Sequence, residues 1–117
     1  MATSGNQQGI DKVEKLVKLF RMMDSEMPMQ TALAFLFVAN NDGKKKETTM
    51  SDIARHVGLQ QGSITRNVSN LSDWTYKKTK GMNLVKMTYD PMDSRRKLVT
   101  LTSKGKTFVN QLEDVIK

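Results

Sequence analysis

Two short helical patterns separated by a glycine, within residues 51–74, most constrain how this chain can fold. Ser51 and Asp52 are residue types that cap helix starts, and Gly58 readily takes the left-handed backbone conformation that ends a helix. The segment between them directs three apolar side chains inward: Ile53, Ala54 and Val57. The second pattern, from Gln61 to about Trp74, places its apolar residues on one helical face: Ile64, Val68, Leu71 and Trp74. Residues 51–74 are therefore predicted to form a helix-turn-helix.

The next regular pattern is a β-hairpin over residues 84–101. Leu84–Tyr89 and Lys97–Leu101 alternate between apolar and polar residues, as half-buried strands do. Residues 90–96 between them contain turn-forming and basic residues. We expect a hairpin, here called the wing, with a long basic tip.

Further helical patterns flank these elements. Apolar residues recur at helical spacing over residues 10–24, and again over 103–117 after a cap at Thr102 or Ser103. A helix beginning near Pro28 is apolar almost all round, which places it in the middle of the core. Residues 47–50 are compatible with a short strand.

The predicted fold class is mainly α with a small β-hairpin wing (α+β), the winged helix-turn-helix architecture. A chain of 117 residues has room for one well-formed hydrophobic core, so we expect one domain. Residues 1–9 are polar and small and are interpreted as a flexible tail. Residues 10–117 are interpreted as a single winged-helix domain.

The basic residues are concentrated in the second part of the chain. Lys and Arg number 19 against 12 Asp and Glu, a net charge of +7. The first 40 residues carry four basic and four acidic side chains, so the whole excess lies beyond Asn40. A uniformly basic surface kept for solubility does not predict this segregation. It favours a polyanionic partner, and with the predicted fold it points to double-stranded DNA.

The second helix of the helix-turn-helix carries the best candidates for reading base edges. Its outward face holds uncharged polar or basic residues and no carboxylate: Gly62, Ser63, Thr65, Arg66, Ser69 and Asn70. Arg66 is the strongest candidate, because a guanidinium can bridge two acceptors of guanine. Asn70, Gln60 and Gln61 suit adenine or phosphate. The alternative is a polar face that is merely solvated.

Basic residues outside this helix are candidates for the minor groove and for phosphate. Arg95 and Arg96 at the wing tip suit the minor groove, although we expect at least one of them to pair with Asp90 or Asp93. Further lysines are candidates for phosphate attraction: Lys77, Lys78, Lys80, Lys97, Lys104 and Lys106. The Lys44–Lys46 triplet is interpreted mainly as a solvated loop, and Trp74 as a core anchor rather than a base-stacking residue.

Composition excludes several classes of site. The chain has no cysteine and one histidine, so thiolate or histidine metal sites and cysteine chemistry are not expected. No nucleophile and base pair or phosphate loop is recognised, so we expect no enzyme, no catalytic residue and no cofactor. His56 is interpreted as a packing or capping residue. Without a signal peptide or an apolar run of membrane-spanning length, a cytoplasmic, nucleoid-associated protein with no membrane contact is expected.

Three stretches of the sequence resemble the MarR-type winged-helix transcriptional regulators. They are MSDIARHVGLQQGSITRNVSNL (50–71), DPMDSRR (90–96) and KLVTLTSKGK (97–106). The resemblance covers residues 10–117 in element order. It implies that Asp93 and Arg95 form the family's wing Asp-x-Arg, with the arginine in the minor groove. It also implies recognition positions at Ser63, Thr65 and Arg66, and a homodimer built from the helices at 10–24 and 103–117.

The connection from Leu71 to Leu84 is longer than the family's short link, so residues 75–81 either extend the recognition helix or form an additional basic loop. Five methionines are interpreted as core or interface filler: Met22, Met23, Met27, Met29 and Met50. A small-molecule effector pocket lined by them is the alternative, although nothing in the sequence requires one.

The leading hypothesis is a sequence-specific, dimeric DNA-binding transcriptional regulator that represses by occupying a promoter. The alternative is a winged-helix protein of replication, packaging or DNA architecture with little sequence preference. A third hypothesis is a winged helix used for protein contacts, because a fold does not fix a function.

Overall fold

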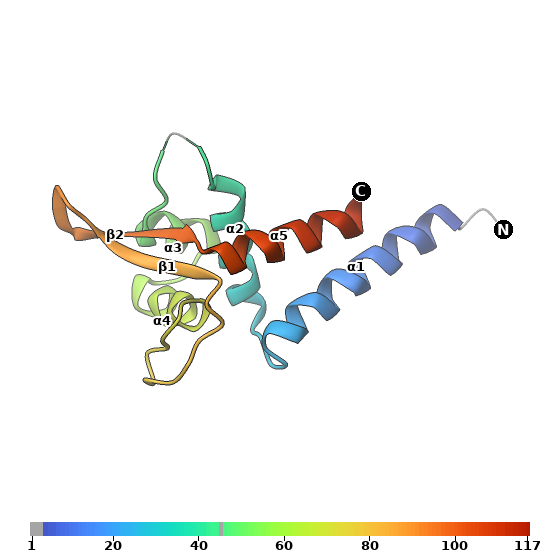
Figure 1. The fold of residues 1–117 in the computed structure, drawn as a ribbon, viewed down its shortest axis with the longest axis horizontal. Helices are drawn as coiled ribbons and strands as arrows, with labels where there is room; N and C mark the ends of the chain where they lie inside the picture. The colour runs from blue at the N-terminus through green and yellow to red at the C-terminus, as the bar shows by residue number, and fades with distance from the viewer. Residues whose placement is uncertain (1–3, 45) are drawn as a thin grey trace.

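The computed structural model describes residues 4–44 and 46–117. This part of the chain contains five helices and one antiparallel hairpin, which confirms the predicted mainly α fold with a β wing (Figure 1). In chain order the elements are α1 (Ser4–Met23), α2 (Met29–Asn41), α3 (Met50–Val57), α4 (Gln61–Leu71), β1 (Val85–Asp90), β2 (Asp93–Leu101) and α5 (Ser103–Ile116).

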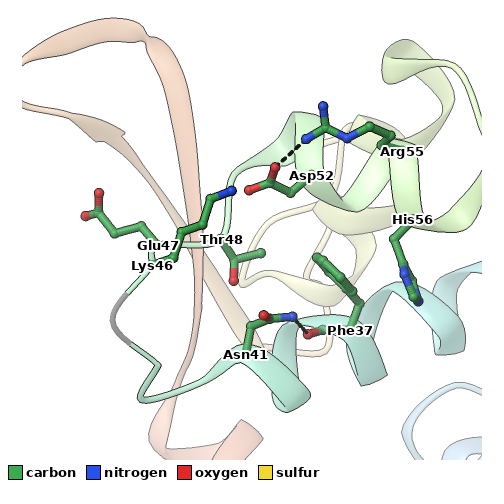
Figure 2. Close-up of a pocket in the computed structure, with 8 residues that line it drawn as sticks. All are labelled: Phe37, Asn41, Lys46, Glu47, Thr48, Asp52, Arg55 and His56. Atoms are coloured by element: carbon green, nitrogen blue, oxygen red, sulfur yellow. Dashed lines mark hydrogen bonds and ion pairs between the residues drawn. The ribbon is translucent and has the colours of Figure 1, made fainter.

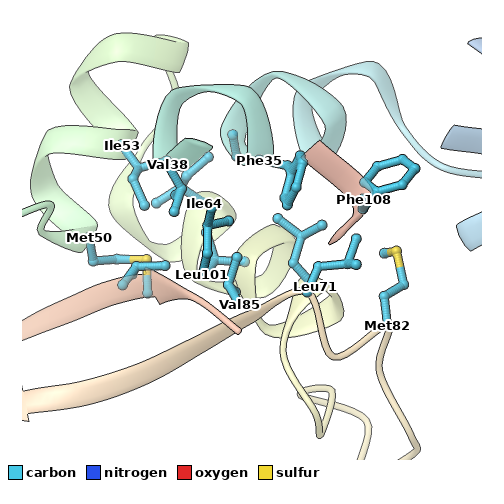
Figure 3. Packing of buried hydrophobic residues seen from close by; sticks show 14 of the residues in the cluster. Phe35, Val38, Met50, Ile53, Ile64, Leu71, Met82, Val85, Leu101 and Phe108 are labelled. Carbon is cyan, nitrogen blue, oxygen red and sulfur yellow. The ribbon is translucent and has the colours of Figure 1, made fainter. Parts of the chain in front are cut away.

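The core forms around α2, which packs against α3, α4 and β2. Phe35 of α2 is fully buried, and so are Ile64 and Leu71 of α4 (Figure 3). Three phenylalanines join α1, α2 and α5. The ring centroids of Phe20 and Phe35 lie 6.2 Å apart, those of Phe20 and Phe108 5.3 Å, and those of Phe35 and Phe108 5.5 Å. Such aromatic contacts add to the free energy gained by area burial, so this cluster attaches the terminal helices to the core.

A capping box defines the start of α3. The Thr49 side chain accepts a hydrogen bond from the Asp52 backbone N–H at 3.1 Å, and the Asp52 carboxylate accepts one from the Thr49 N–H at 3.1 Å. The cap is therefore Thr49 rather than Ser51 or Asp52 as predicted, because Asp52 occupies the third helical position of the box. Gly58 ends the helix at φ 83°, as predicted.

Helix α4 ends at Leu71, three residues earlier than predicted, and Trp74 does not lie in the core. The Ser72 hydroxyl donates a hydrogen bond to the Ser69 carbonyl at 2.7 Å, and such a local bond competes with helix continuation. The chain then returns, and the Leu84 N–H donates to the Leu71 carbonyl at 2.7 Å. Trp74 therefore leaves the apolar stripe of α4, and 54% of it remains exposed.

The wing is a longer and tighter hairpin than expected. Strand β1 extends to Asp90 and β2 begins at Asp93, which leaves Pro91 and Met92 as the turn. The predicted long basic tip is wrong, because residues 93–96 belong to β2 rather than to a loop. Asp93 pairs with Asp90, and residues 94–96 form an irregularity in the strand before Lys97 pairs with Tyr89. The predicted strand at 47–50 is reduced to a single bridge between Thr49 and Leu98, with Met50 already in α3.

The terminal helices lie on the side of the molecule away from the wing tip (Figure 1). Helix α1 begins at Ser4, so within the described residues the predicted flexible tail 1–9 is helical from that residue on. Hydrophobic periodicity could not reveal this, because residues 4–9 are polar or glycine and add no apolar stripe. Helix α5 is capped by Thr102, one of the two predicted cap residues, and the Thr102 hydroxyl accepts from the Gly105 N–H at 3.0 Å.

We predict that Asp52→Asn destabilises the fold by about 1 kcal/mol near neutral pH, because the capping box loses its carboxylate. Partial burial raises the pKa of Asp52, but hydrogen bonds with Thr49 and the positive charges of Lys46 and Arg55 outweigh burial and hold the pKa below 3.8. Such a carboxylate stabilises the fold above its unfolded pKa, and the contribution is lost as pH falls through the folded pKa.

The difference in the free energy of unfolding between wild type and Asp52→Asn should therefore shrink as the pH falls below about 4. Urea denaturation at several pH values measures it. Asp11→Asn, at an exposed position of α1, is the control and should have little effect. A difference that is constant from pH 7 to pH 3 would contradict the assigned role of the carboxylate.

Candidate nucleic-acid interface

Helix α4 presents a polar face opposite the residues that it buries. Ile64 and Val68 are fully buried, whereas Gln61, Gly62 and Arg66 are exposed. Ser63 and Thr65 are half-buried, and the Thr65 hydroxyl donates to the Gln61 carbonyl at 2.7 Å. No residue of α4 carries a carboxylate. The exposed N-terminal part of α4 can therefore approach an anionic surface without charge repulsion.

A polar contact that sequence reasoning missed holds α4 against α2. The Thr31 hydroxyl, fully buried, donates to the Asn67 side-chain oxygen at 2.5 Å, and the Asn67 amide donates to the Ser63 carbonyl at 2.8 Å. Asn67 lies three residues after Ile64, next to the apolar stripe, and this position was the available signal. The contact helps to fix the rotation of α4 and hence which side chains face outward.

Two of the residues placed on the outward face of α4 are less accessible than expected. Ser69 is buried, and its hydroxyl donates to the Arg66 carbonyl at 2.7 Å and accepts from the Tyr76 N–H at 3.1 Å. Asn70 is half-buried beneath the returning chain, where its carbonyl accepts from the Met82 N–H at 3.0 Å. The long connection after α4 covers this end of the helix, so the accessible surface lies at its N-terminal end.

Both wing arginines pair with aspartates, which confirms the expectation that at least one would. Arg96 binds the carboxylate of Asp90, which is only 10% exposed, and lies 3.9 Å from Glu47. Arg95 pairs with Asp93 at 3.1 Å, yet 90% of its side chain remains exposed. The structure therefore gives Arg96 a role in wing stability and leaves Arg95 available for an external partner.

The Asp93 carboxylate stays charged beside this arginine. Hydrogen bonds from the Arg95 side chain and backbone lower the pKa of Asp93, and the positive charge of Arg96 contributes in the same direction. The pair places the guanidinium of Arg95 beside Asp93 at the start of β2.

A cationic groove of about 280 Å³ runs between the wing and α3. It brings together four predicted residues: Gln61, Arg95, Arg96 and Lys97. Arg55 and Lys46 also line it, and sequence reasoning did not select Arg55, because an exposed arginine on a helix carries no distinguishing signal. Lys45 lies outside the described residues. The groove has the charge and the exposed donors that a phosphate backbone requires.

A neighbouring pocket of about 310 Å³ lies between the end of α2, the loop at Lys46–Thr48 and α3 (Figure 2). Arg55 pairs with Asp52 at 2.6 Å across its upper edge. His56 stacks on Phe37 with ring centroids 4.4 Å apart, which agrees with its interpretation as a packing residue. The described residues contain no group of histidine or acidic side chains arranged to hold a metal ion.

The other predicted residues lie outside the groove. Gln60 is exposed and precedes α4 as its N-cap residue. Lys77, Lys78 and Lys80 are exposed on a turn after α4, so the long connection forms an additional basic loop rather than an extension of the helix. Lys104 is tied to the domain, because its amine donates to the Met82 carbonyl at 2.9 Å. No helix among the described residues is long and apolar enough to cross a membrane.

We predict that Arg96→Ala destabilises the domain by about 1–2 kcal/mol, because it leaves the buried Asp90 carboxylate without its charged partner. Arg95→Ala, the matched variant on the same strand, should change the free energy of unfolding by less than about 0.5 kcal/mol, as expected for an exposed pair. Urea denaturation of both variants measures this. Equal losses would contradict the assignment of different roles to the two arginines.

No protein-family model and no curated protein matches the sequence. Solved structures do. S. aureus MepR in complex with DNA matches 98% of this chain and 77% of its own, with 16% identity and a TM-score of 0.63.

Two further matches have comparable coverage. The PcaV transcriptional regulator from Streptomyces coelicolor has 20% identity and a TM-score of 0.60 over 97% of this chain and 76% of its own. Bordetella bronchiseptica BpsR has 18% identity and a TM-score of 0.56 over 95% and 76%. The architecture, with its long terminal helices, helix-turn-helix and wing, is thus the winged-helix fold that these solved structures share.

Proposed function

We propose that this protein is a sequence-specific DNA-binding regulator of transcription. The observation that carries the proposal is the convergence of the carboxylate-free N-terminal end of α4 with the cationic groove between the wing and α3. Gln61 belongs to both surfaces. A protein that inserts a helix into the major groove needs such flanking cations, because phosphate contacts position the helix and base contacts supply specificity.

The exposed end of α4 supplies the proposed base contacts. Arg66 is exposed, and among the residues of α4 its guanidinium alone can donate two parallel hydrogen bonds to guanine. Ser63 and Thr65 are half-buried neighbours on the same short helix and suit phosphate or single base-edge contacts. Asn70 contributes less to the proposed base contacts, because the connection that follows α4 covers it.

The wing supplies the proposed second contact. Arg95 is highly exposed and stands at the start of β2, so it can reach a minor groove beside the major groove that α4 occupies. Arg96 and Lys97 line the cationic groove and contribute to phosphate attraction. Arg96 does so while paired with Asp90, and its main role is to hold the wing.

The solved structures of similar fold support this reading. MepR was crystallised in complex with DNA, PcaV is a transcriptional regulator, and the DNA binding of BpsR is regulated by 6-hydroxynicotinic acid. The proposal for this chain is repression by promoter occupancy, with no catalytic step.

We predict that Arg66→Ala lowers affinity for a site selected from a random duplex pool by about 1–3 kcal/mol, the value of a bidentate base contact, and reduces discrimination against random duplex. Fluorescence anisotropy with both duplexes, at several salt concentrations, measures this. Lys15→Ala, a basic exposed position on α1 that does not line the apolar groove between α1 and α2, is the control and should leave both affinities unchanged.

Two results would decide against sequence readout. If Arg66→Ala weakens selected and random duplexes equally, Arg66 contacts phosphate rather than bases. If wild-type protein binds random duplex as tightly as any selected site, the protein acts in replication, packaging or DNA architecture. The exposed Lys77, Lys78 and Lys80 suit that second function. Absence of salt-sensitive binding would instead favour protein contacts.

The proposal includes a homodimer formed through the terminal helices. Helix α1 exposes four large apolar residues on its described surface, Ile10, Val13, Val17 and Met22, and α5 exposes Ile116. An apolar groove of about 700 Å³ continues this surface between α1 and α2. Contiguous exposed apolar surface of this kind marks an interaction site, and a second copy would cover the same surface on both subunits. Two recognition helices would then face successive major grooves.

We predict that Val17→Asp converts the dimer to monomer and lowers affinity for a pseudopalindromic site at least tenfold, because a charge at the apolar interface lacks a partner. Sedimentation velocity and anisotropy measure the two effects. Lys18→Asp, the adjacent exposed position on α1, is the control for added negative charge. A wild-type protein that stays monomeric at micromolar concentration would contradict the dimer.

A further inference from the structure

The connection after α4 forms a second exposed surface that the duplex interface does not use. We call residues 73–81 the aromatic-basic turn. Trp74 and Tyr76 stand two residues apart in its first arm and are 54% and 51% exposed. Lys77, Lys78 and Lys80 are exposed around them, and the Lys77 amine lies 5.8 Å from the centre of the Tyr76 ring. Asp73 is the turn's single acidic residue.

The turn is an ordered structure rather than a loose loop. Thr75 and Thr79 close it, with the Thr75 N–H donating to the Thr79 carbonyl at 2.8 Å and their hydroxyls 2.7 Å apart. Trp74 and Lys80 form a β-bridge. Lys78 at the tip has φ 62°, a conformation that glycine or asparagine adopts more easily. The chain thus carries a lysine at a position where the backbone conformation favours glycine or asparagine.

The turn is attached firmly to the end of α4. The Tyr76 N–H donates to the Ser69 hydroxyl at 3.1 Å, and the Gly81 N–H donates to the Asp73 carbonyl at 3.0 Å. Gly81 passes so close to Ser72 that a Cβ at this position would lie 2.0 Å from the Ser72 carbonyl oxygen. The backbone that carries the two aromatic residues is therefore held at the surface, and both side chains are exposed there instead of being used in the core.

We propose that the aromatic-basic turn binds single-stranded DNA, with Trp74 and Tyr76 stacking on bases and the lysines contacting phosphates. Phosphate attraction to a duplex requires only the lysines. Exposed aromatic rings interleaved with cations are what proteins use to bind unpaired bases, because every base offers a π face once it leaves the duplex stack. The turn adjoins α4, so a strand that separates next to the proposed duplex site can reach it. This second site does not depend on sequence readout by α4.

The protein contains one tryptophan, so its fluorescence reports on this site alone. Titration of wild-type protein with a (dT)10 oligonucleotide should quench Trp74 emission. Anisotropy of labelled (dT)10 should show that Trp74→Ala and Tyr76→Ala each lower affinity about tenfold. Lys78→Gly should lower it a few-fold while keeping the turn, because glycine accepts the positive φ.

Matched controls separate this site from the duplex interface. Tyr89→Ala removes another exposed tyrosine with a lysine near its ring, on β1, and should leave (dT)10 affinity unchanged. Arg66→Ala should weaken duplex binding and not (dT)10 binding. Thermal denaturation of each variant checks that the fold is kept.

Three results would overturn the proposal. The first is unchanged Trp74 emission at saturating (dT)10. The second is equal (dT)10 affinity for wild type, Trp74→Ala and Lys78→Gly. The third is a Trp74 emission change that follows protein concentration without DNA, because it would show that a second copy of the chain covers the turn. Loss of duplex binding with retained (dT)10 binding would instead count against the proposed function alone.

Discussion

The structure depends on the burial of α2 between the helix-turn-helix and the terminal helices. Phe35 is fully buried and Val38 nearly so, and α2 packs against α3, α4 and β2. Burying a large apolar side chain contributes about 1.5–3 kcal/mol, so these contacts together outweigh any surface ion pair in the molecule. Because α2 is held on several sides, α4 must pack in one orientation against it. The direction of the polar face of α4 follows from this packing.

The packing against α2 decides how the polar face of α4 is oriented. Ile64 and Val68 of α4 are fully buried, and the Thr31 to Asn67 hydrogen bond satisfies polar groups where α4 packs against α2. A buried polar pair with good geometry specifies orientation more strictly than apolar contacts alone. Arg66 consequently faces solvent, on the element that also borders the cationic groove.

The two arginines of the wing have different roles, which their identical residue type does not reveal. Arg95 and Arg96 are adjacent in sequence and both exposed at the irregular start of β2, but each pairs with a different carboxylate. Arg96 meets the poorly exposed carboxylate of Asp90, and Arg95 extends outward beside Asp93. One arginine therefore stabilises the hairpin and the other is available to a partner. The structure thus narrows the proposed minor-groove contact to Arg95.

Much of the fold could be predicted from periodicity, because the helices and the wing each bury one face with its own spacing. The helix-turn-helix, the glycine that ends α3 and the Thr102 cap are examples that the structure confirms. Errors occurred where hydrogen bonds rather than apolar spacing set an element's end. Ser72 stops α4, and cross-strand pairing extends the wing into what was expected to be its tip.

The sequence by itself determined the element order, the single core and the concentration of positive charge beyond residue 40, since these depend on local spacing and composition. Only the tertiary structure decided which polar residues are accessible. Ser69 is covered, Trp74 and Tyr76 are exposed on a fixed turn, and Arg55 joins the groove with Arg95. The physical reason is that exposure and charge proximity depend on contacts between segments far apart in the chain, which a local pattern does not encode.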